Sequence, residues 1–344
     1  MLLRRGRYPR WNVEGELLNG EMMKIGIIGF GDWPRQAYAP LLAEMPEVQV
    51  VAVAARSNTT RGLAKQTFGP NLRTFDNYHD LLNTETVDAV LIALPNSQHG
   101  EGLEAAAKSN KHLFFEPPIA GDAATATRVL DALAAAEGIV QADLELRYLS
   151  AMDAVLARLQ SGTLGQPLMA KICLWCDWGY KGGSWFDEVQ GESFFLWLGA
   201  WYLDVLDCVF EAEPTQARVV GGYSSNGTLM DHGWASLAYH GGGIGQFEFN
   251  LGVPQDTIIA LNVACQAGEL VADLQTGKWR WRGESGDWHR EHCPASTPIY
   301  GFVGMRESLQ GFFGAIRTGR APRANIDVAC RVQRACQLCA DAAQ

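Results

Sequence analysis

Between residues 24 and 143 the chain alternates between short apolar runs and amphipathic runs of helical length. The apolar runs, which we expect to be strands, cover 24–28, 48–54, 87–93, 112–115 and 139–143. The helical runs cover 34–45, about 59–67, 97–109 and 122–137. Predominantly apolar strands that alternate with helices are typical of a doubly wound parallel sheet. We therefore predict an α/β domain over 23–143, with its ligand at the carboxyl ends of the strands.

After Arg147 the pattern changes to that of an α+β domain. We expect helices at 150–160 and 193–209, and strands at 168–177, 216–224, 232–240, 244–251, 257–264 and 269–274. Gly and Asn turns separate the later strands, which predicts a predominantly antiparallel open sheet. The glycine run 241–245 joins two strands and opens no helix, so we interpret it as a hairpin turn. Helices at 303–317 and 325–341 should pack back toward the first domain, within a second domain over 144–344.

Residues 1–22 contain four arginines but no apolar core segment, so they do not match a secretory signal. We expect a disordered extension there. Met22 and Met23 stand directly before the first strand, which is consistent with an upstream start codon for the extension. The 344 residues are enough for two domains, each with its own core.

A glycine turn follows the first strand. Gly29-Phe30-Gly31 lies between the strand 24–28 and the first helical run, the arrangement that holds a dinucleotide pyrophosphate. Gly29 permits the sharp turn, Gly31 lets the backbone approach the phosphates, and the helix N-terminus offers N–H groups to the anion. Pro34 replaces the third glycine of G-x-G-x-x-G. Proline is tolerated in the first turn of a helix, so we expect the site to be kept.

The end of the second strand bears on the choice of cofactor. NAD-selective folds place an acidic residue there, whereas this chain has Ala55, Arg56 and Ser57. An arginine beside a hydroxyl suits a 2′-phosphate, so we expect NADP, with NAD as the other possibility. The competing interpretation is that Arg56 is a solvated loop residue.

Charge and cysteine content restrict the partners. The net charge of −10 argues against nucleic acid and anionic membrane, and no apolar run is long enough to span a bilayer. The eight cysteines lack zinc-ribbon spacing, which favours buried free thiols in a reducing cytoplasm and no metal. We expect a cytoplasmic protein with a small-molecule substrate.

Several motifs resemble the glucose–fructose oxidoreductase, inositol dehydrogenase and rhizopine-catabolism (Gfo/Idh/MocA) family. The resemblance runs from about Met23 to the last helix. It implies a Rossmann domain and an antiparallel α+β domain, with NAD(P) and substrate between them. Its motifs are Gly29-Phe30-Gly31, Pro95-Asn96-Ser97-Gln98-His99, Lys111 to Glu116 with Pro118, Arg147-Tyr148, Gly165-Gln166-Pro167, Gly199 with Asp204, and Phe312 to Pro322.

The chain departs from the family where the chemistry is expected. The family motif Glu-Lys-Pro is here Glu116-Pro117-Pro118, so Pro117 replaces the lysine. The family's Asp-x-x-x-His-x-x-Asp is here Trp197, Trp201 and Asp204, which we expect on one helix face. Because proline and tryptophan cannot exchange a proton at neutral pH, the usual acid–base pair is absent.

Three accounts follow from this loss. The first is an oxidoreductase with a relocated proton donor, for which the candidates are Lys181, Tyr180, Tyr202, Asp204, Arg147 and Asp177. The second is a flat conjugated substrate reduced at carbon, as in the distantly related biliverdin reductases, in an aromatic pocket that includes Trp178, Trp197 and Trp201. The third is a redox-silent member that acts as a nucleotide-binding regulatory or scaffold subunit, or that runs a redirected non-redox reaction.

The predicted cofactor site gathers the ends of four strands. The resemblance places His99 near the cofactor, whereas position alone would also fit a surface histidine at a helix start. The Pro117–Pro118 bond is a candidate cis peptide. Nine tryptophans in the second domain favour a homo-oligomer formed through its sheet. The predicted cofactor-binding residues are Gly29, Phe30, Gly31, Asp32, Trp33, Pro34, Arg56, Ser57, Leu94, Pro95, Asn96, His99, Glu116 and Pro117.

Overall fold

A computed structural model describes residues 10–11, 17–18, 22–177, 193–223, 230–253, 256–299 and 301–343. The chain divides into two compact units. Unit one comprises Met1–Asp143 and Leu309–Asp327, and unit two comprises Leu144–Ser308 and Val328–Gln344. Each unit is described by itself.

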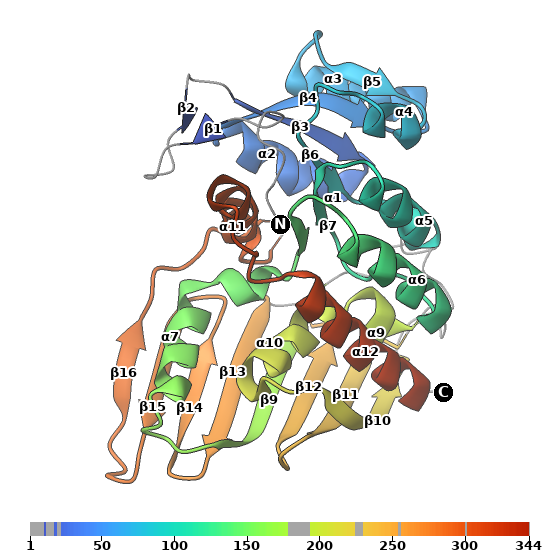
Figure 1. Cartoon of the computed structure of the whole chain (residues 1–344). Coiled ribbons are helices and arrows are strands. Elements are labelled where there is room, and N and C mark those ends of the chain that lie inside the picture. Colours follow the sequence, from blue (N-terminus) through green and yellow to red (C-terminus); the bar gives the residue numbers. More distant parts are fainter. Residues whose placement is uncertain are drawn as a thin grey trace. The chain divides into compact units, whose positions relative to one another are not determined.

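Unit one contains the predicted parallel sheet, shown in blue and green in Figure 1. Its six strands lie in the order β5-β4-β3-β6-β7-β8, and every neighbouring pair is parallel. This is the doubly wound arrangement, and it confirms the predicted α/β fold class. The strands are β3 (Met23–Ile28), β4 (Val48–Ala54), β5 (Arg73–Phe75), β6 (Ala89–Ile92), β7 (His112–Phe115) and β8 (Val140–Ala142).

Helices connect these strands, and the first predicted helix is broken in two. Pro40 has no N–H to donate to the carbonyl of Gln36, so a continuous helix over 34–45 is disfavoured and Ala37 separates α1 from α2. The helices of unit one are α1 (Asp32–Gln36), α2 (Tyr38–Ala43), α3 (Asn58–Phe68), α4 (Tyr78–Leu82), α5 (Asn96–Ala107) and α6 (Ala123–Ala134). Within the segment 1–22, β1 (Arg10–Trp11) pairs with β2 (Leu17–Leu18).

A late segment of the chain adds to unit one. The helix α11 (Met305–Thr318) belongs to this unit from Leu309 onward. Its Phe312 ring lies 5.5 Å from the Phe114 ring of β7, and the Ala142 N–H donates to the Ala324 carbonyl at 3.0 Å. The segment therefore packs on β7 and extends the hydrogen bonding of β8.

Unit two is built on an eight-stranded sheet in the order β10-β11-β12-β9-β13-β14-β15-β16. Of its pairings only β12 with β9 is parallel, so the predicted antiparallel open sheet is confirmed. The glycine run 241–245 forms the hairpin between β11 and β12, as predicted. The strands are β9 (Pro167–Trp175), β10 (Pro214–Gly222), β11 (His232–Tyr239), β12 (Ile244–Asn250), β13 (Ile258–Cys265), β14 (Gly268–Asp273), β15 (Lys278–Arg282) and β16 (His289–His292).

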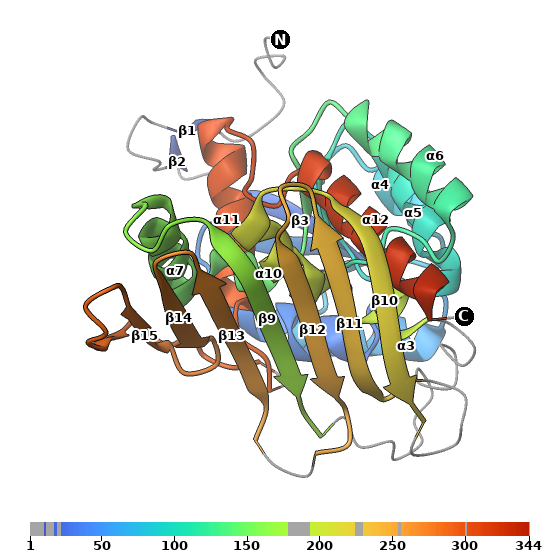
Figure 2. The same cartoon turned by 90° about the horizontal axis from the view of Figure 1, so that it is seen from below.

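Helices cover one face of this sheet. Figure 2 shows α7 and α10 behind the strands, and in the described part of unit two no helix lies on the face toward the viewer. Phe194 stacks on Phe249 of β12 at 3.9 Å between ring centroids, so the covered face holds the aromatic core. The helical elements are η1 (Glu145–Tyr148), α7 (Ser150–Gln160), α9 (Phe194–Trp197), α10 (Ala200–Phe210) and α12 (Ile326–Ala342), of which α12 enters unit two at Val328.

Candidate functional site

The glycine turn lies at the point where the strand order of unit one reverses. The turn follows β3, and Leu94-Pro95-Asn96 follows the neighbouring β6. Gly29 has a φ of +84°, and a Cβ atom there would stand 2.1 Å from the Ala93 carbonyl oxygen. Only glycine fits this position, because both the left-handed backbone and the adjacent strand exclude a side chain. Ligands of doubly wound sheets bind at this switch point.

Gly31 leaves open space beside the turn. It is the N-cap of α1, and a Cβ atom built on it would meet nothing within 4 Å. No side chain caps this helix start, so the first-turn N–H groups face the turn. The Asp32 carboxylate in this first turn is ion-paired with Arg35, which offsets its negative charge near a phosphate. Phe30 points into the core, where its ring lies 5.5 Å from that of Phe68.

Arg56 and Ser57 follow β4 at the same edge, and both are exposed. Ser57 caps α3, since its Oγ accepts from the Thr60 N–H at 3.0 Å. Arg61 donates to the carbonyls of Ala55 and Arg56 at 2.6 and 2.7 Å, so it fixes the loop rather than reaching outward. In the described part of the chain, Arg56 makes no ion pair. Its guanidinium is therefore available to an anion at the strand end.

An acidic residue that the sequence analysis missed lies at the same edge. Asp76 directly follows β5, the strand beside β4, and the Ala55 N–H donates to the Phe75 carbonyl at 2.9 Å. The three-residue strand β5 was not predicted, so the position of Asp76 next to Arg56 was not either. The edge thus offers both a cation and a carboxylate to a ribose.

His99 is buried in α5, not exposed at its surface. Burial lowers the pKa of the imidazole to about 4, against the raising effect of the carbonyls of Glu116 and Leu94 beside the ring. The ring is therefore neutral at physiological pH. It lies 6.4 Å from the Phe115 ring, between centroids, and braces the ends of β6 and β7.

Glu116 connects the glycine turn to the end of β7. Its Oε1 accepts from Trp33 Nε1 at 2.7 Å and also from the Tyr38 hydroxyl. Burial raises the pKa of the Glu116 carboxyl to about 7, although hydrogen bonds from Tyr38, Trp33 and Asp143 act in the opposite direction. The Pro117–Pro118 bond that follows is cis, as predicted.

In unit two, Arg147 and Asp204 are engaged with each other. Arg147 Nε lies 3.1 and 3.2 Å from the two carboxylate oxygens, and its Nη2 also reaches Asp204 and, at 3.1 Å, Asp207. Arg331 donates to Asp207 at 2.7 and 2.9 Å. Burial raises the pKa of Asp204 to about 6, against the lowering effect of Arg147, so the carboxylate is charged at neutral pH. These four residues form one hydrogen-bonded network within unit two.

The tryptophan positions lie on two helices. The sequence predicted one helix over 193–209 with Trp197, Trp201 and Asp204 on one face, which is wrong. The helix is interrupted at Leu198 and Gly199, where a Cβ atom on the glycine would stand 2.6 Å from the Phe195 carbonyl oxygen. Trp197 ends α9 and is buried, while Trp201 lies on α10 and is half-buried.

The remaining candidate site residues of unit two differ in burial, and some lie outside the described residues. Tyr202 is buried and stacks on Phe247 at 5.0 Å between centroids, and burial raises the pKa of its hydroxyl well above the ordinary value. Asp177 is exposed just after β9. Trp178, Tyr180 and Lys181 lie outside the described residues.

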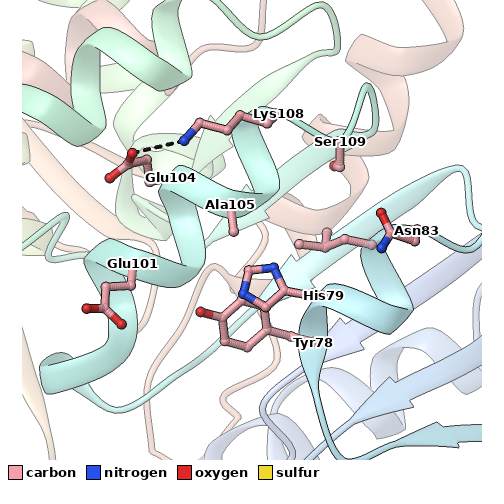
Figure 3. A pocket seen from close by; sticks show the side chains of 9 residues that line it. Tyr78, His79, Asn83, Glu101, Glu104, Ala105, Lys108 and Ser109 are labelled. Atoms are coloured by element: carbon pink, nitrogen blue, oxygen red, sulfur yellow. Dashed lines mark hydrogen bonds and ion pairs between the residues drawn. The ribbon is translucent and has the colours of Figure 1, made fainter.

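Figure 3 shows a groove between α4 and α5 of unit one. Its volume is about 430 Å³, and its lining residues include Tyr78, His79, Glu101, Glu104 and Lys108. Glu104 is held by Lys108 and Arg128 at 3.0 and 2.9 Å. Among the described residues no group of His, Cys, Asp and Glu could hold a metal ion, and none of the helices there combines the length and apolarity needed to cross a bilayer.

Comparison with known proteins places these features in one family. Residues 23–144 match the model of an oxidoreductase family with an NAD-binding Rossmann fold, and residues 152–271 match the GFO/IDH/MocA C-terminal domain. The chain is 35% identical over 144 residues to dTDP-3,4-didehydro-2,6-dideoxy-alpha-D-glucose 3-reductase of Streptomyces violaceoruber, 42% of this chain and 41% of that protein. It is 31% identical over 148 residues to inositol 2-dehydrogenase of Salmonella paratyphi B, 43% of this chain and 44% of that protein. The match thus spans less than half the length of these curated relatives.

Solved structures share the whole fold. A levoglucosan dehydrogenase in complex with NADH and levoglucosan superposes with a TM-score of 0.82 at 16% identity, covering 94% of this chain and 97% of that one. A myo-inositol 2-dehydrogenase from Lactobacillus plantarum gives 0.79 at 18% identity, covering 94% and 97%. Because the two family models together cover more than half of the sequence, the chain belongs to the Gfo/Idh/MocA family of NAD(P)-binding oxidoreductases.

Proposed function

We propose that this protein is an NADP-leaning oxidoreductase that interconverts an alcohol and a carbonyl group on a small polyhydroxylated substrate. The observation that carries the proposal is the open space at Gly31, beside the turn that only Gly29 can make. A pyrophosphate fits this space, with the first-turn N–H groups of α1 as donors. The bound nicotinamide would supply the hydride chemistry, and the protein would supply binding, orientation and proton transfer.

The preference for NADP rests on Arg56. Its exposed guanidinium stands at the end of β4, where a cofactor ribose is held in this fold, and can hydrogen-bond a 2′-phosphate. Ser57 adds a hydroxyl whose Oγ already caps α3, so it is the weaker partner. Asp76 at the neighbouring strand end would favour NAD instead. The decisive test is therefore to remove the charge of Arg56 and that of Asp76 in separate variants and to compare their affinities for NADPH and NADH.

The substrate class is inferred from relatives. The similar curated proteins are named as an inositol dehydrogenase and a deoxysugar reductase, and one similar structure contains levoglucosan. A cyclitol or sugar hydroxyl is the substrate that these names have in common. A conjugated acceptor is the second substrate class, because Trp197 and Trp201 replace an aspartate and a histidine of the family motif with aromatic surface.

Oligomerisation through the uncovered face of the large sheet is part of the proposal. Val220 and Trp234 are cross-strand partners on β10 and β11 and are 62% and 47% exposed. Met169 and Ile244 are paired on β9 and β12 and are 56% and 46% exposed. Between these two pairs the same face carries the Lys171–Glu248 ion pair, so it combines exposed apolar side chains with polar ones. Large exposed apolar side chains on an uncovered sheet face favour an interface between copies of the chain.

The alternative is a redox-silent family member, which Pro117 and Trp201 favour because they replace the lysine and histidine of the family motifs. The test is a titration of NADPH and NADP monitored by tryptophan fluorescence, followed by nicotinamide absorbance with inositols, sugars, simple carbonyls and conjugated pigments. We expect saturable binding and turnover on at least one polyhydroxylated compound. Binding without turnover on the whole panel would support the redox-silent alternative, and no binding would contradict both.

A further inference from the structure

Two carboxyl groups meet at the carboxyl edge of the parallel sheet. Glu116 directly follows β7 and Asp143 directly follows β8, and these strands are neighbours in register. The Asp143 N–H donates to the Phe115 carbonyl at 2.8 Å, and the Glu116 N–H donates to the Ile92 carbonyl at 3.1 Å. The backbone hydrogen bonds therefore hold the Cα atoms of Glu116 and Asp143 next to each other at the ends of β7 and β8.

The two side chains are hydrogen-bonded to each other in a nearly dry environment. Asp143 is fully buried and Glu116 is 9% exposed. The side chains of Asp143 and Glu116 share a hydrogen bond, in which either carboxyl can be the donor. The Glu116 carboxyl also accepts hydrogen bonds from Trp33 Nε1 and the Tyr38 hydroxyl. A hydrogen bond between two carboxyl groups requires a proton on one of them, because two carboxylates have only acceptors. Among the described residues no lysine or arginine forms an ion pair with Glu116.

We propose that Glu116 is the proton acceptor and donor of the reaction, and that Asp143 is a positioning residue that shares its proton. This inference rests on the proposed function. In the oxidation direction the substrate C–H bond breaks and its electron pair goes with the hydrogen to the oxidised nicotinamide. The O–H bond breaks and its proton goes to a Glu116 carboxylate oxygen, and the C=O bond forms from the electron pair left behind. The reduction direction returns the same proton to the carbonyl oxygen.

The position of Glu116 favours it over the other candidates in the described chain. It directly precedes Pro117, the position at which the family motif has a lysine. Its carboxyl is tied to Trp33, two residues after the open Gly31, so it stands at the cofactor edge of unit one. Arg147 and Asp204 are engaged in the network with Asp207 and Arg331, and Tyr202 is buried in the aromatic core.

The electrostatics agree with this role. The titratable groups that face the Glu116 carboxyl are Asp143 from the end of β8 and Tyr38 from α2, and the His99 ring lies beside its backbone carbonyl. Burial raises the pKa of Glu116 to about 7. A general acid–base group is most effective when its pKa lies near the working pH.

The test is infrared pH-difference spectroscopy of the cofactor-free protein, which sees the C=O stretch of a protonated carboxyl directly. We expect a band that is lost with a midpoint near pH 7 and that is absent in Glu116→Gln, separate from the band of buried Asp204, which has its midpoint near pH 6 and remains in the variant. Tyr38→Phe removes a donor to the carboxylate and should move the midpoint up by about one pH unit, whereas Asp143→Asn supplies a permanent donor and should move it down. The exposed Glu101→Gln is the matched control and should leave the band unchanged.

A second measurement separates this inference from the proposed function. At saturating NADPH, Glu116→Gln should lose roughly 10²- to 10⁴-fold in kcat on any substrate that the wild type turns over. Glu116→Asp should restore part of that loss. NADPH binding without a neutral-pH carboxyl band, or with a band that survives Glu116→Gln, would overturn the proton role alone. A band without NADPH binding would instead overturn the proposed function.

Discussion

Removing Arg147 should destabilise unit two far more than removing an exposed arginine. Asp204 is 0% exposed, and in Arg147→Met it loses the guanidinium that contacts both of its oxygens. Arg331 remains bonded to Asp207. Breaking a buried ion pair from one side costs about 3–5 kcal/mol, because an uncompensated charge stays in the interior.

The matched control is Arg334→Met, also in unit two. Arg334 pairs with Glu213 at 2.6 Å, and these side chains are 58% and 43% exposed. An exposed pair of this kind contributes about 1 kcal/mol or less. The double variant with Arg147→Met and Asp204→Asn removes both buried charges, so we expect it to be more stable than Arg147→Met alone.

The destabilisation caused by Arg147→Met should also increase as the pH rises. Asp204 has a pKa of about 6 in the folded wild type, above its ordinary value of 3.8, so its contribution to stability falls as the pH rises through that interval. Without Arg147 the pKa of Asp204 in the folded protein rises further, because the lowering effect of the guanidinium is gone. The free energy of unfolding of Arg147→Met therefore continues to fall at pH values where that of the wild type has levelled off. Arg147→Met should therefore be closest to the wild type near pH 5 and most destabilised near pH 8.

Urea unfolding followed by tryptophan fluorescence measures this, since nine of the eleven tryptophans lie after Leu144. A free energy of unfolding for Arg147→Met that equals that of Arg334→Met at pH 8 would refute the reasoning. It would show that the buried network does not hold unit two together.

Three further predictions concern the cofactor edge and the sheet face. Arg56→Ala should raise the Kd for NADPH at least tenfold more than the Kd for NADH, as measured by fluorescence titration. Asp76→Asn should weaken the binding of NADH only. Equal losses of affinity for NADPH and NADH in Arg56→Ala would exclude a 2′-phosphate role for Arg56. Folded Glu116 keeps its proton up to about pH 7, whereas an unfolded glutamate releases it near pH 4.5. Between these pH values the free energy of unfolding of the wild type should therefore fall by about 3 kcal/mol relative to Glu116→Gln, as measured by urea unfolding. Parallel pH profiles of the two proteins would contradict the burial of a protonated carboxyl. Val220→Glu with Trp234→Glu should convert an oligomer to monomers in light scattering coupled to gel filtration, and an unchanged mass would exclude this face as the interface.

The sequence predicted the regular elements of both units well. The limits of β4 (Val48–Ala54) and β7 (His112–Phe115) agree with the predicted 48–54 and 112–115, because both runs are predominantly apolar and end at a polar residue or turn. The short β5 was missed, since three residues carry too little pattern. Two helices were predicted as continuous although each is interrupted, the first near Pro40 and the second at Leu198 and Gly199.

The chemistry was harder to predict than the fold. The Arg147–Asp204 pair joins residues 57 positions apart, and nothing in their local sequence shows that each neutralises the other. The Glu116–Asp143 pair had a usable signal, because both residues end predicted strands of one parallel sheet. Recognising it required the knowledge that β7 and β8 are neighbours, which follows from the strand order and not from the composition of either strand.

The central claim is that a dinucleotide phosphate occupies the space beside Gly31, and a calorimetric NADPH titration of Gly31→Val tests it most directly. A Cβ atom at this position meets no atom of the chain within 4 Å, and Gly31 has a negative φ of −72°, so we expect the variant to fold as the wild type does. Gly62→Val is the matched control, because Gly62 on α3 is equally open and lies away from the turn. The account predicts saturable NADPH binding for the wild type and Gly62→Val and at least a hundredfold weaker binding for Gly31→Val. Equal affinity in all three proteins would contradict it.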